Sequence, residues 1–99
     1  MSPHHSNSLE ELPQRVDEVL HYLWDPIGIS DEPGARDEYA SYVPGVMSLL
    51  VTDASVPQIG KHLDHIVVNQ IGLPSNLEHC TQVAHILIAW RKNLFPPPA

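Results

Sequence analysis

Apolar residues recur three and four positions apart in four separate segments of this chain, and Pro, Gly or a capping residue bounds each segment. This spacing places the apolar side chains of a segment on one face of an α-helix. The segments span residues 12–24, 35–51, 55–72 and 75–94. The β-branched residues of the third segment also suit a strand, but the cap in front of them and their period favour a helix. The sequence therefore predicts an all-α fold, a small four-helix bundle.

Proline, glycine and capping residues predict where these helices begin and end. Pro26 ends the first helix, because proline disfavours helical backbone at the residue before it. Pro44 lies inside the second segment and predicts either a kink or two short helices. Ser55 and Ser75 each stand three residues before Gln or Glu, so we expect them to cap the third and fourth helices. Gly72 is expected to end the third helix in the left-handed conformation.

The apolar stripes of the segments identify the predicted core. The stripe of the first helix is Leu12, Val16, Val19, Leu20 and Leu23. The stripe of the fourth helix is Leu77, Cys80, Val83, Ala84, Leu87, Trp90 and Leu94. Ile86 and Ile88 lie partly outside this second stripe, which makes the fourth helix apolar on more than one side. We therefore expect it to be the central helix of the bundle.

The domain organisation follows from length and from the two ends of the chain. With 99 residues the chain suffices for one modest core and is too short for two. We expect a disordered N-terminus over residues 1–8, a single helical domain over 9–95 and a Pro-rich tail over 96–99. No basic segment followed by an apolar run opens the chain, and no apolar run approaches the ~20 residues that span a bilayer. These features predict a cytoplasmic protein.

Acidic residues outnumber basic ones, with 12 Asp and Glu against 5 Lys and Arg and a formal net charge of -7. Binding to nucleic acid or to an anionic membrane needs clustered Lys and Arg, so we expect neither ligand. The charge suits a basic protein partner, and it equally suits a protein that only has to stay soluble. The single cysteine, Cys80, excludes an internal disulfide.

The segment from Trp24 to Pro44 combines acidic and aromatic residues with Pro and Gly at several positions. A Pro/Gly-rich acidic loop of this kind, between the first and second helices, is typical of a recognition surface. The residues expected to face a partner are Asp31, Glu32, Asp37, Glu38, Tyr39 and Tyr42. Four others are expected to shape the loop, namely Trp24, Asp25, Pro26 and Gly28. Of these, Trp24 should be buried, and Asp25 should accept hydrogen bonds from loop amides.

Seven histidines raise metal binding as another function. His62 and His65 are three residues apart and could share a helix face, but neither HExxH nor paired Cys spacing is present. Cys80 has histidines nearby in sequence, yet it falls on the apolar stripe and is most simply a core residue. No Gly-rich phosphate loop is present. We therefore expect no enzymatic activity and no cofactor, with His62 and His65 as weak metal candidates.

The motif WDPIG, followed by an acidic loop and DEYxxYxP, resembles a family of small bacterial proteins of unassigned function. The two parts of the motif are residues 24–28 and 37–44, and the resemblance covers residues 17–90. It departs at residues 67–70, where the family pattern leads us to expect an acidic residue and Arg or Lys. The resemblance implies a small helical domain without known activity, of a size and charge often found among immunity or antitoxin partners of secreted toxins.

Charge and resemblance together predict a non-enzymatic binding protein, an immunity-type inhibitor whose acidic loop docks on a basic partner such as a cognate toxin. Two alternatives stay open. One is a metal- or small-ligand-binding domain that uses His62, His65 and loop carboxylates. The other is a structural homodimer through the surplus apolar side of the fourth helix, formed by Ile86, Ile88 and Trp90.

Overall fold

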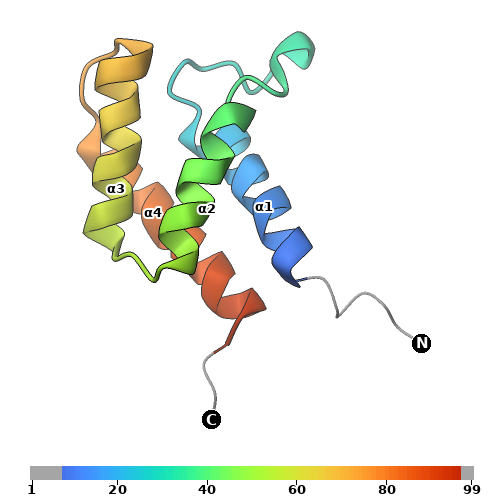
Figure 1. The fold of residues 1–99 in the computed structure, drawn as a ribbon. Coiled ribbons are helices and arrows are strands. Elements are labelled where there is room, and N and C mark those ends of the chain that lie inside the picture. The colour runs from blue at the N-terminus through green and yellow to red at the C-terminus, as the bar shows by residue number, and fades with distance from the viewer. Residues whose placement is uncertain (1–7, 97–99) are drawn as a thin grey trace.

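Helices make up most of the computed structural model, which describes residues 8–96 (Figure 1). The four α-helices are α1 (Ser8–Val19), α2 (Val43–Val51), α3 (Val56–His65) and α4 (Leu77–Leu94). Shorter helical turns lengthen or precede them, and the described part of the chain contains no strand. The predicted all-α fold with four helices is confirmed. Residues 1–7 and 97–99, on which most of the two predicted ends fall, lie outside the described range.

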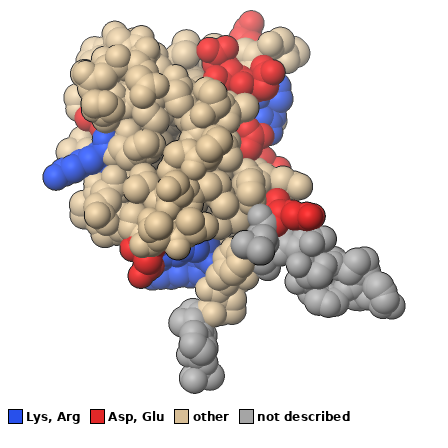
Figure 2. Space-filling model, in the orientation of Figure 1, with Lys and Arg blue, Asp and Glu red and all other residues tan. Residues whose placement is uncertain are grey.

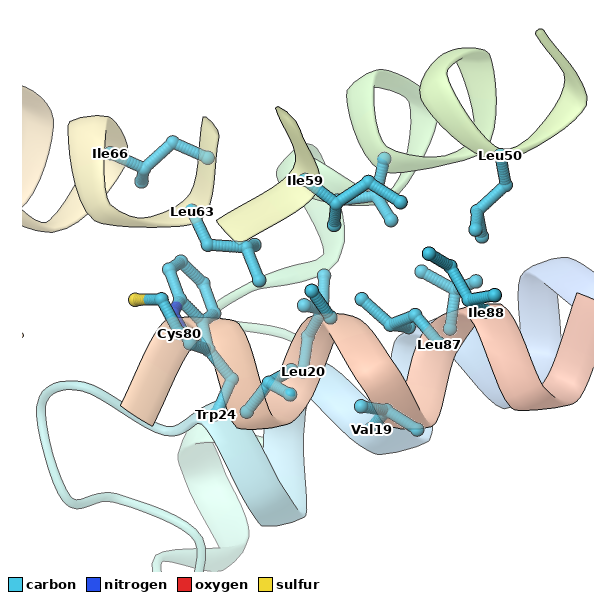
Figure 3. Close-up of a cluster of buried hydrophobic side chains, with 14 of the residues drawn as sticks. Val19, Leu20, Trp24, Leu50, Ile59, Leu63, Ile66, Cys80, Leu87 and Ile88 are labelled. Carbon is cyan, nitrogen blue, oxygen red and sulfur yellow. The ribbon is translucent and has the colours of Figure 1, made fainter. Parts of the chain in front are cut away.

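The longest helix, α4, packs against α1, α2 and α3 and runs behind α2 in the view of Figure 1. This central position agrees with the apolar residues that its sequence carries on more than one side. Side chains from all four helices meet between them, and Ile59 and Leu63 of α3 face Leu87 of α4 (Figure 3). The buried apolar residues are Leu12, Val16, Val19, Leu20, Trp24, Tyr39, Val46, Leu50, Ala54, Ile59, Leu63, Ile66, Val67, Cys80, Val83, Ala84, Leu87 and Ile88.

The first helix ends in a π-helical turn, η2 (Leu20–Trp24). Its last hydrogen bond runs from Asp25 N to the Leu20 carbonyl oxygen, five residues back, at 3.0 Å. The wider turn changes which side chains face the core, because the spacing no longer follows the α-helical period. Leu20 and Trp24 are buried, whereas Leu23 is 47% exposed. The prediction that Leu23 belongs to the buried stripe is therefore wrong.

Pro44 lies in the first turn of α2, where its missing N–H is not needed. The predicted second segment is consequently divided. A single 3₁₀ turn, η3 (Pro33–Ala35), ends where this segment is expected to begin, and a second, η4 (Ala40–Tyr42), precedes α2. Of the two outcomes expected for Pro44, the structure has the shorter helices and no kink. The chain from Asp25 to Tyr42 therefore crosses one end of the bundle as a loop with isolated turns (Figure 1).

Local capping signals fix both ends of the third segment. The Ser55 hydroxyl accepts from Gln58 N at 3.3 Å, and the Gln58 side chain accepts from Ser55 N at 2.7 Å, so the predicted capping box is confirmed. The helix continues through a π-helical turn, η5 (Ile66–Ile71), and ends at Gly72, whose φ of 85° is the left-handed conformation that glycine adopts without strain.

Asn76, and not Ser75, caps α4. The Asn76 side chain accepts from His79 N at 3.4 Å. Ser75 instead donates its hydroxyl to Asp64 at 2.7 Å, and the same carboxylate accepts from Asn76 N at 2.7 Å. The capping role predicted for Ser75 is wrong, because the carboxylate from α3 takes its hydroxyl. Leu77 is exposed as well and does not belong to the predicted stripe.

Membrane insertion finds no support in these helices. Among residues 8–96, none of them combines the length and the apolar character that crossing a bilayer requires.

Candidate protein-binding surface

Trp24 fixes the start of the loop to the bundle. Its side chain is buried, and its ring meets those of Tyr39 and Tyr42 edge to face, with centroids 5.4 Å and 5.8 Å away. The Trp24 carbonyl oxygen accepts a hydrogen bond from His79 Nε2 at 3.1 Å. Aromatic packing and this bond to α4 together hold the point at which the loop leaves the helix.

The carboxylate of Asp25 organises the following turn. It accepts hydrogen bonds from Ile29 N at 2.8 Å, from Ser30 N at 3.1 Å and from the Tyr39 hydroxyl at 2.8 Å. Burial by itself raises the pKa of Asp25, but these hydrogen bonds outweigh it and hold the pKa below its ordinary value. Asp25 also has a left-handed backbone, with φ of 33°, which costs free energy and persists only where the surroundings enforce it. The side-chain bonds provide that enforcement.

Two further residues expected to shape the loop, Pro26 and Gly28, lie in the same turn. Gly28 has a φ of 77°, so a side chain there would be strained, and Gly28 N donates to the Asp25 carbonyl oxygen at 3.1 Å. Pro26 is half-buried and follows the left-handed Asp25 directly. The segment from Trp24 to Ser30 is thus a tightly bonded turn.

Tyr39 is a structural residue of this loop in the described conformation. Its side chain is only 1% exposed, and its hydroxyl accepts from Ile27 N at 3.0 Å while it donates to Asp25. Burial raises the pKa of Tyr39, and the neighbouring Asp25 carboxylate raises it further. The expectation that Tyr39 faces a partner is corrected, because a buried ring has no surface to offer. Tyr42 is half-buried against Trp24.

The four predicted acidic residues, in contrast, are all exposed at this end of the molecule. Asp31, Glu32, Asp37 and Glu38 have no side-chain hydrogen bond or ion pair to any residue between 8 and 96. Figure 2 shows a group of acidic side chains gathered at the upper right, where the loop lies in Figure 1. We call these four residues the acidic cluster.

Arg36 lies within the sequence of the acidic cluster but does not neutralise it. Its guanidinium pairs with Asp17 of α1 at 3.0 Å and stacks over the Tyr22 ring at 5.4 Å. Other carboxylates of the bundle are paired too: Glu11 and Glu18 with Arg15, and Asp53 with Arg91. Arg36 therefore pins the loop to α1 and leaves the acidic cluster with uncompensated charge.

A cavity of about 240 Å³ opens beside the Trp24–Gly28 turn. It lies between this turn, the end of the third helical segment and the start of α4. The residues that line it are Trp24, Pro26, Val67, Leu73, Pro74, Asn76, His79 and Cys80. Sequence reasoning missed this cavity and the role of His79, because its walls come from segments some fifty residues apart and no local motif marks them.

Within residues 8–96, the two weak metal candidates do not come together with a third possible ligand. His62 is half-buried, and burial followed by the charge of His65 lowers its pKa. His65 is exposed, and its Nδ1 lies 3.0 Å from the Asn69 amide nitrogen. Between residues 8 and 96, no three His, Cys, Asp or Glu side chains come close enough together to hold an ion.

Cys80 occupies the core at the inner end of the cavity. It is completely buried, and burial raises the pKa of its thiol, an effect that the nearby Trp24 indole N–H only partly opposes. A thiol held in its protonated form is a poor nucleophile. The geometry thus gives Cys80 a packing role in this conformation.

The outer side of α4 carries a second apolar surface. Ile86, Ala89, Trp90 and Asn93 line a groove of about 320 Å³ there. Ile88 does not take part, since it is buried in the core, so its predicted place on a dimer surface is wrong. Arg15 stacks its guanidinium over the Trp90 ring at 5.7 Å.

Comparison with known proteins adds no relative. A scan against protein-family models, a search of curated proteins and a search of solved structures found no match to this chain. The resemblance carried by WDPIG and DEYxxYxP accordingly stays an expectation from the sequence.

Proposed function

We propose that this chain is a non-enzymatic, cytoplasmic binding protein that docks its acidic cluster on a basic protein, as an immunity-type inhibitor does on its toxin. The observation that carries the proposal is the uncompensated charge of Asp31, Glu32, Asp37 and Glu38, which are exposed and lack a cationic partner in the described structure. Clustered exposed charge speeds association with an oppositely charged surface and selects against wrong partners.

The way the loop is fastened supports recognition over simple solubility. Asp25 and Tyr39 close its two ends by a side-chain hydrogen bond of 2.8 Å, and Arg36 ties its middle to Asp17 at 3.0 Å. A fastened loop loses little conformational freedom when a partner binds, so more of the interaction energy appears as affinity. Charge needed only for solubility requires no such fixed display.

Placement of the acidic cluster also fits an inhibitor. It lies at one end of the bundle and not along a helix side, so it can enter a basic cleft of a partner (Figures 1 and 2). The resemblance to small bacterial proteins of the immunity or antitoxin kind points the same way. A basic active cleft masked in this manner would be closed to its own anionic substrate.

The test is affinity capture from a lysate of the source cells, followed by binding measurements with the captured protein. One bait carries Asp37→Asn and Glu38→Gln. The matched control carries Glu10→Gln and Asp53→Asn, which removes the same charge from exposed positions elsewhere. We expect wild type and control to retain one basic protein that the loop variant loses, with an affinity that falls as salt rises. Equal retention by both variants would contradict the proposal.

A second candidate function, a homodimer through α4, is favoured by the groove of Ile86, Ala89, Trp90 and Asn93. An exposed apolar groove on a helix suits an isologous contact with a second copy. Light scattering at micromolar concentration tests it: a dimer mass that Ala89→Glu reduces to the monomer supports this candidate, and a monomer mass for the wild type excludes it.

A further inference from the structure

The cavity beside the Trp24–Gly28 turn is a preformed pocket, which we call the socket. Pro26 and Pro74 both line it, and proline rings have little freedom to collapse inward. The turn wall is fixed by Asp25, and the α4 wall is fixed to the turn by His79, whose Nε2 donates to the Trp24 carbonyl oxygen. A socket whose walls are bonded to each other needs little rearrangement to receive a ligand.

The size of the cavity limits what can occupy it. Its volume of about 240 Å³ is below the roughly 300–1,000 Å³ typical of small-molecule and cofactor sites. It suits a single large side chain. Interface hot spots commonly consist of one aromatic side chain inserted into such a pocket on the partner.

The lining favours an aromatic occupant. Val67, Leu73 and the two prolines supply apolar walls, and no Lys or Arg of the described residues lines the cavity. At its inner end the indole nitrogen of Trp24 lies beside Cys80 (Figure 3), and this buried N–H has no nitrogen or oxygen partner in the described residues. The Trp24 ring would give an aromatic guest an edge-to-face or offset neighbour.

Exposed apolar side chains occur in the wall of the cavity and next to its lining residues in the chain. Leu73 lines the cavity and is 36% exposed, Ile27 follows Pro26 in the chain and is 46% exposed, and Leu77 follows Asn76 and is 43% exposed. Apolar residues left in water around a concave site are typical of a surface that a protein partner covers. The acidic cluster begins three residues after Gly28, on the same loop that forms one wall.

From these features we infer that the cavity is the anchor pocket for one aromatic side chain of the basic partner, flanked in that partner by Lys or Arg residues that meet the acidic cluster. This inference rests on the proposed function and names the chemistry that the partner presents. The aromatic side chain fills the socket, while the charged residues on either side of it supply attraction and orientation.

The experiment uses the full chain labelled with ¹⁵N and two capped peptides, Lys-Lys-Phe-Lys-Lys and Lys-Lys-Ala-Lys-Lys. Each peptide is titrated while the indole N–H signals of Trp24 and Trp90 are followed by NMR. We expect the Phe peptide to shift the Trp24 signal, to leave Trp90 unchanged, and to bind about 5- to 30-fold more tightly than the Ala peptide. Leu73→Ala should remove most of this preference, whereas Val51→Ala, at an exposed site on α2, should preserve it.

The outcomes separate the pocket from the proposed function. Equal, salt-sensitive binding of both peptides without a shift at Trp24 would overturn the pocket and leave the acidic surface standing. Binding of neither peptide would count against the acidic surface and the pocket together. A Phe preference that survives Leu73→Ala places the aromatic ring elsewhere and also overturns the pocket.

Discussion

The Tyr39 hydroxyl donates a hydrogen bond of 2.8 Å to Asp25, fourteen residues earlier in the chain. The same hydroxyl accepts from Ile27 N at 3.0 Å, so one phenol oxygen satisfies both a carboxylate and a backbone amide of the turn. The bond closes the loop that carries the acidic cluster. It ties a residue with strained backbone, Asp25, to one that is fully packed in the core. The conformation of the loop therefore depends on the packing of Tyr39 in the core.

Tyr39→Phe should lower the free energy of unfolding by about 1–3 kcal/mol. Phe keeps the ring in the core but leaves Ile27 N without an acceptor and removes one donor from the Asp25 carboxylate. Urea unfolding followed by circular dichroism measures the change. Tyr42→Phe is the matched control, because the Tyr42 hydroxyl makes no hydrogen bond with residues 8–96, and it should change stability by less than about 0.5 kcal/mol. Equal losses in the two variants would show that the hydroxyl of Tyr39 has no special role.

Acid should weaken the same loop. The pKa of Asp25 is lower in the folded protein than its ordinary value of 3.8. The unfolded chain then binds more protons in this range, so the stability that Asp25 supplies is complete above 3.8 and is lost as pH falls through the folded pKa. Asp25→Asn, which tolerates the left-handed backbone but loses the charge, should be less stable than wild type at pH 7. The difference in free energy of unfolding between the two proteins should narrow toward pH 2, as unfolding curves measured at several pH values will show. A difference that does not change with pH would contradict the lowered pKa of Asp25.

Features set by neighbouring residues could be predicted from the sequence. The capping box of Ser55 and Gln58, the left-handed end at Gly72 and the break at Pro44 each depend on a few consecutive residues. The helical period likewise sufficed for the number of helices and for most of the core, including the central place of α4. Features that depend on a few consecutive residues or on the helical period can be predicted from a single sequence.

Features that depend on distant partners could not be predicted. Ser75 loses its capping role to Asp64, eleven residues away, and Tyr39 is buried through its bond to Asp25. The cavity draws its walls from both halves of the chain, and His79 reaches Trp24 across 55 residues. No local spacing encodes these contacts, so the sequence predicts an acidic loop with a buried Trp24 and a hydrogen-bonded Asp25 but neither the cavity nor the place of Tyr39.

The acidic cluster should contribute nothing to stability. A variant that neutralises Asp31, Glu32, Asp37 and Glu38 by Asn and Gln should unfold within about 0.5 kcal/mol of wild type, or at a slightly higher temperature in low salt as like charges are removed. Asp17→Asn is the comparison, since it releases Arg36 from its 3.0 Å ion pair and loosens the middle of the loop, and it should lower the free energy of unfolding by up to about 1 kcal/mol. Differential scanning calorimetry in low and high salt measures the unfolding of both variants and of the wild type. A large loss in the neutralised variant would give these carboxylates a structural role and weaken the binding proposal.

Gly60 sets how closely α3 approaches α4. A Cβ atom there would lie 3.0 Å from the Thr81 hydroxyl and 3.3 Å from the Thr81 Cα, so Gly60→Ala has to push the two helices apart. Overpacking of this kind costs about 1–3 kcal/mol, more than the gain of roughly 0.5–1 kcal/mol from helix propensity.

At Gly45 the nearest atoms belong only to the His62 ring, at 3.3 Å, and this side chain can shift. Gly45→Ala should therefore be neutral or stabilising in the same thermal unfolding assay, and the reverse order would show that α3 and α4 are not in this close contact.

Because of the π-helical turn at the end of the first helix, we expect alanine substitutions of two leucines three residues apart to differ in their effect on stability. Leu20 is buried and Leu23 is 47% exposed, although an uninterrupted α-helical stripe includes both. Leu20→Ala removes core atoms and should cost about 2–5 kcal/mol, while Leu23→Ala should cost less than about 1 kcal/mol. Chemical denaturation of the two variants measures the difference.

Similar large losses of stability in both variants would mean that Leu23 faces the core. This would require a regular α-helix through Trp24 and a different start for the loop. Because Trp24 forms one wall of the cavity, that result would also alter the anchor pocket, so this pair of variants tests the backbone on which the pocket depends.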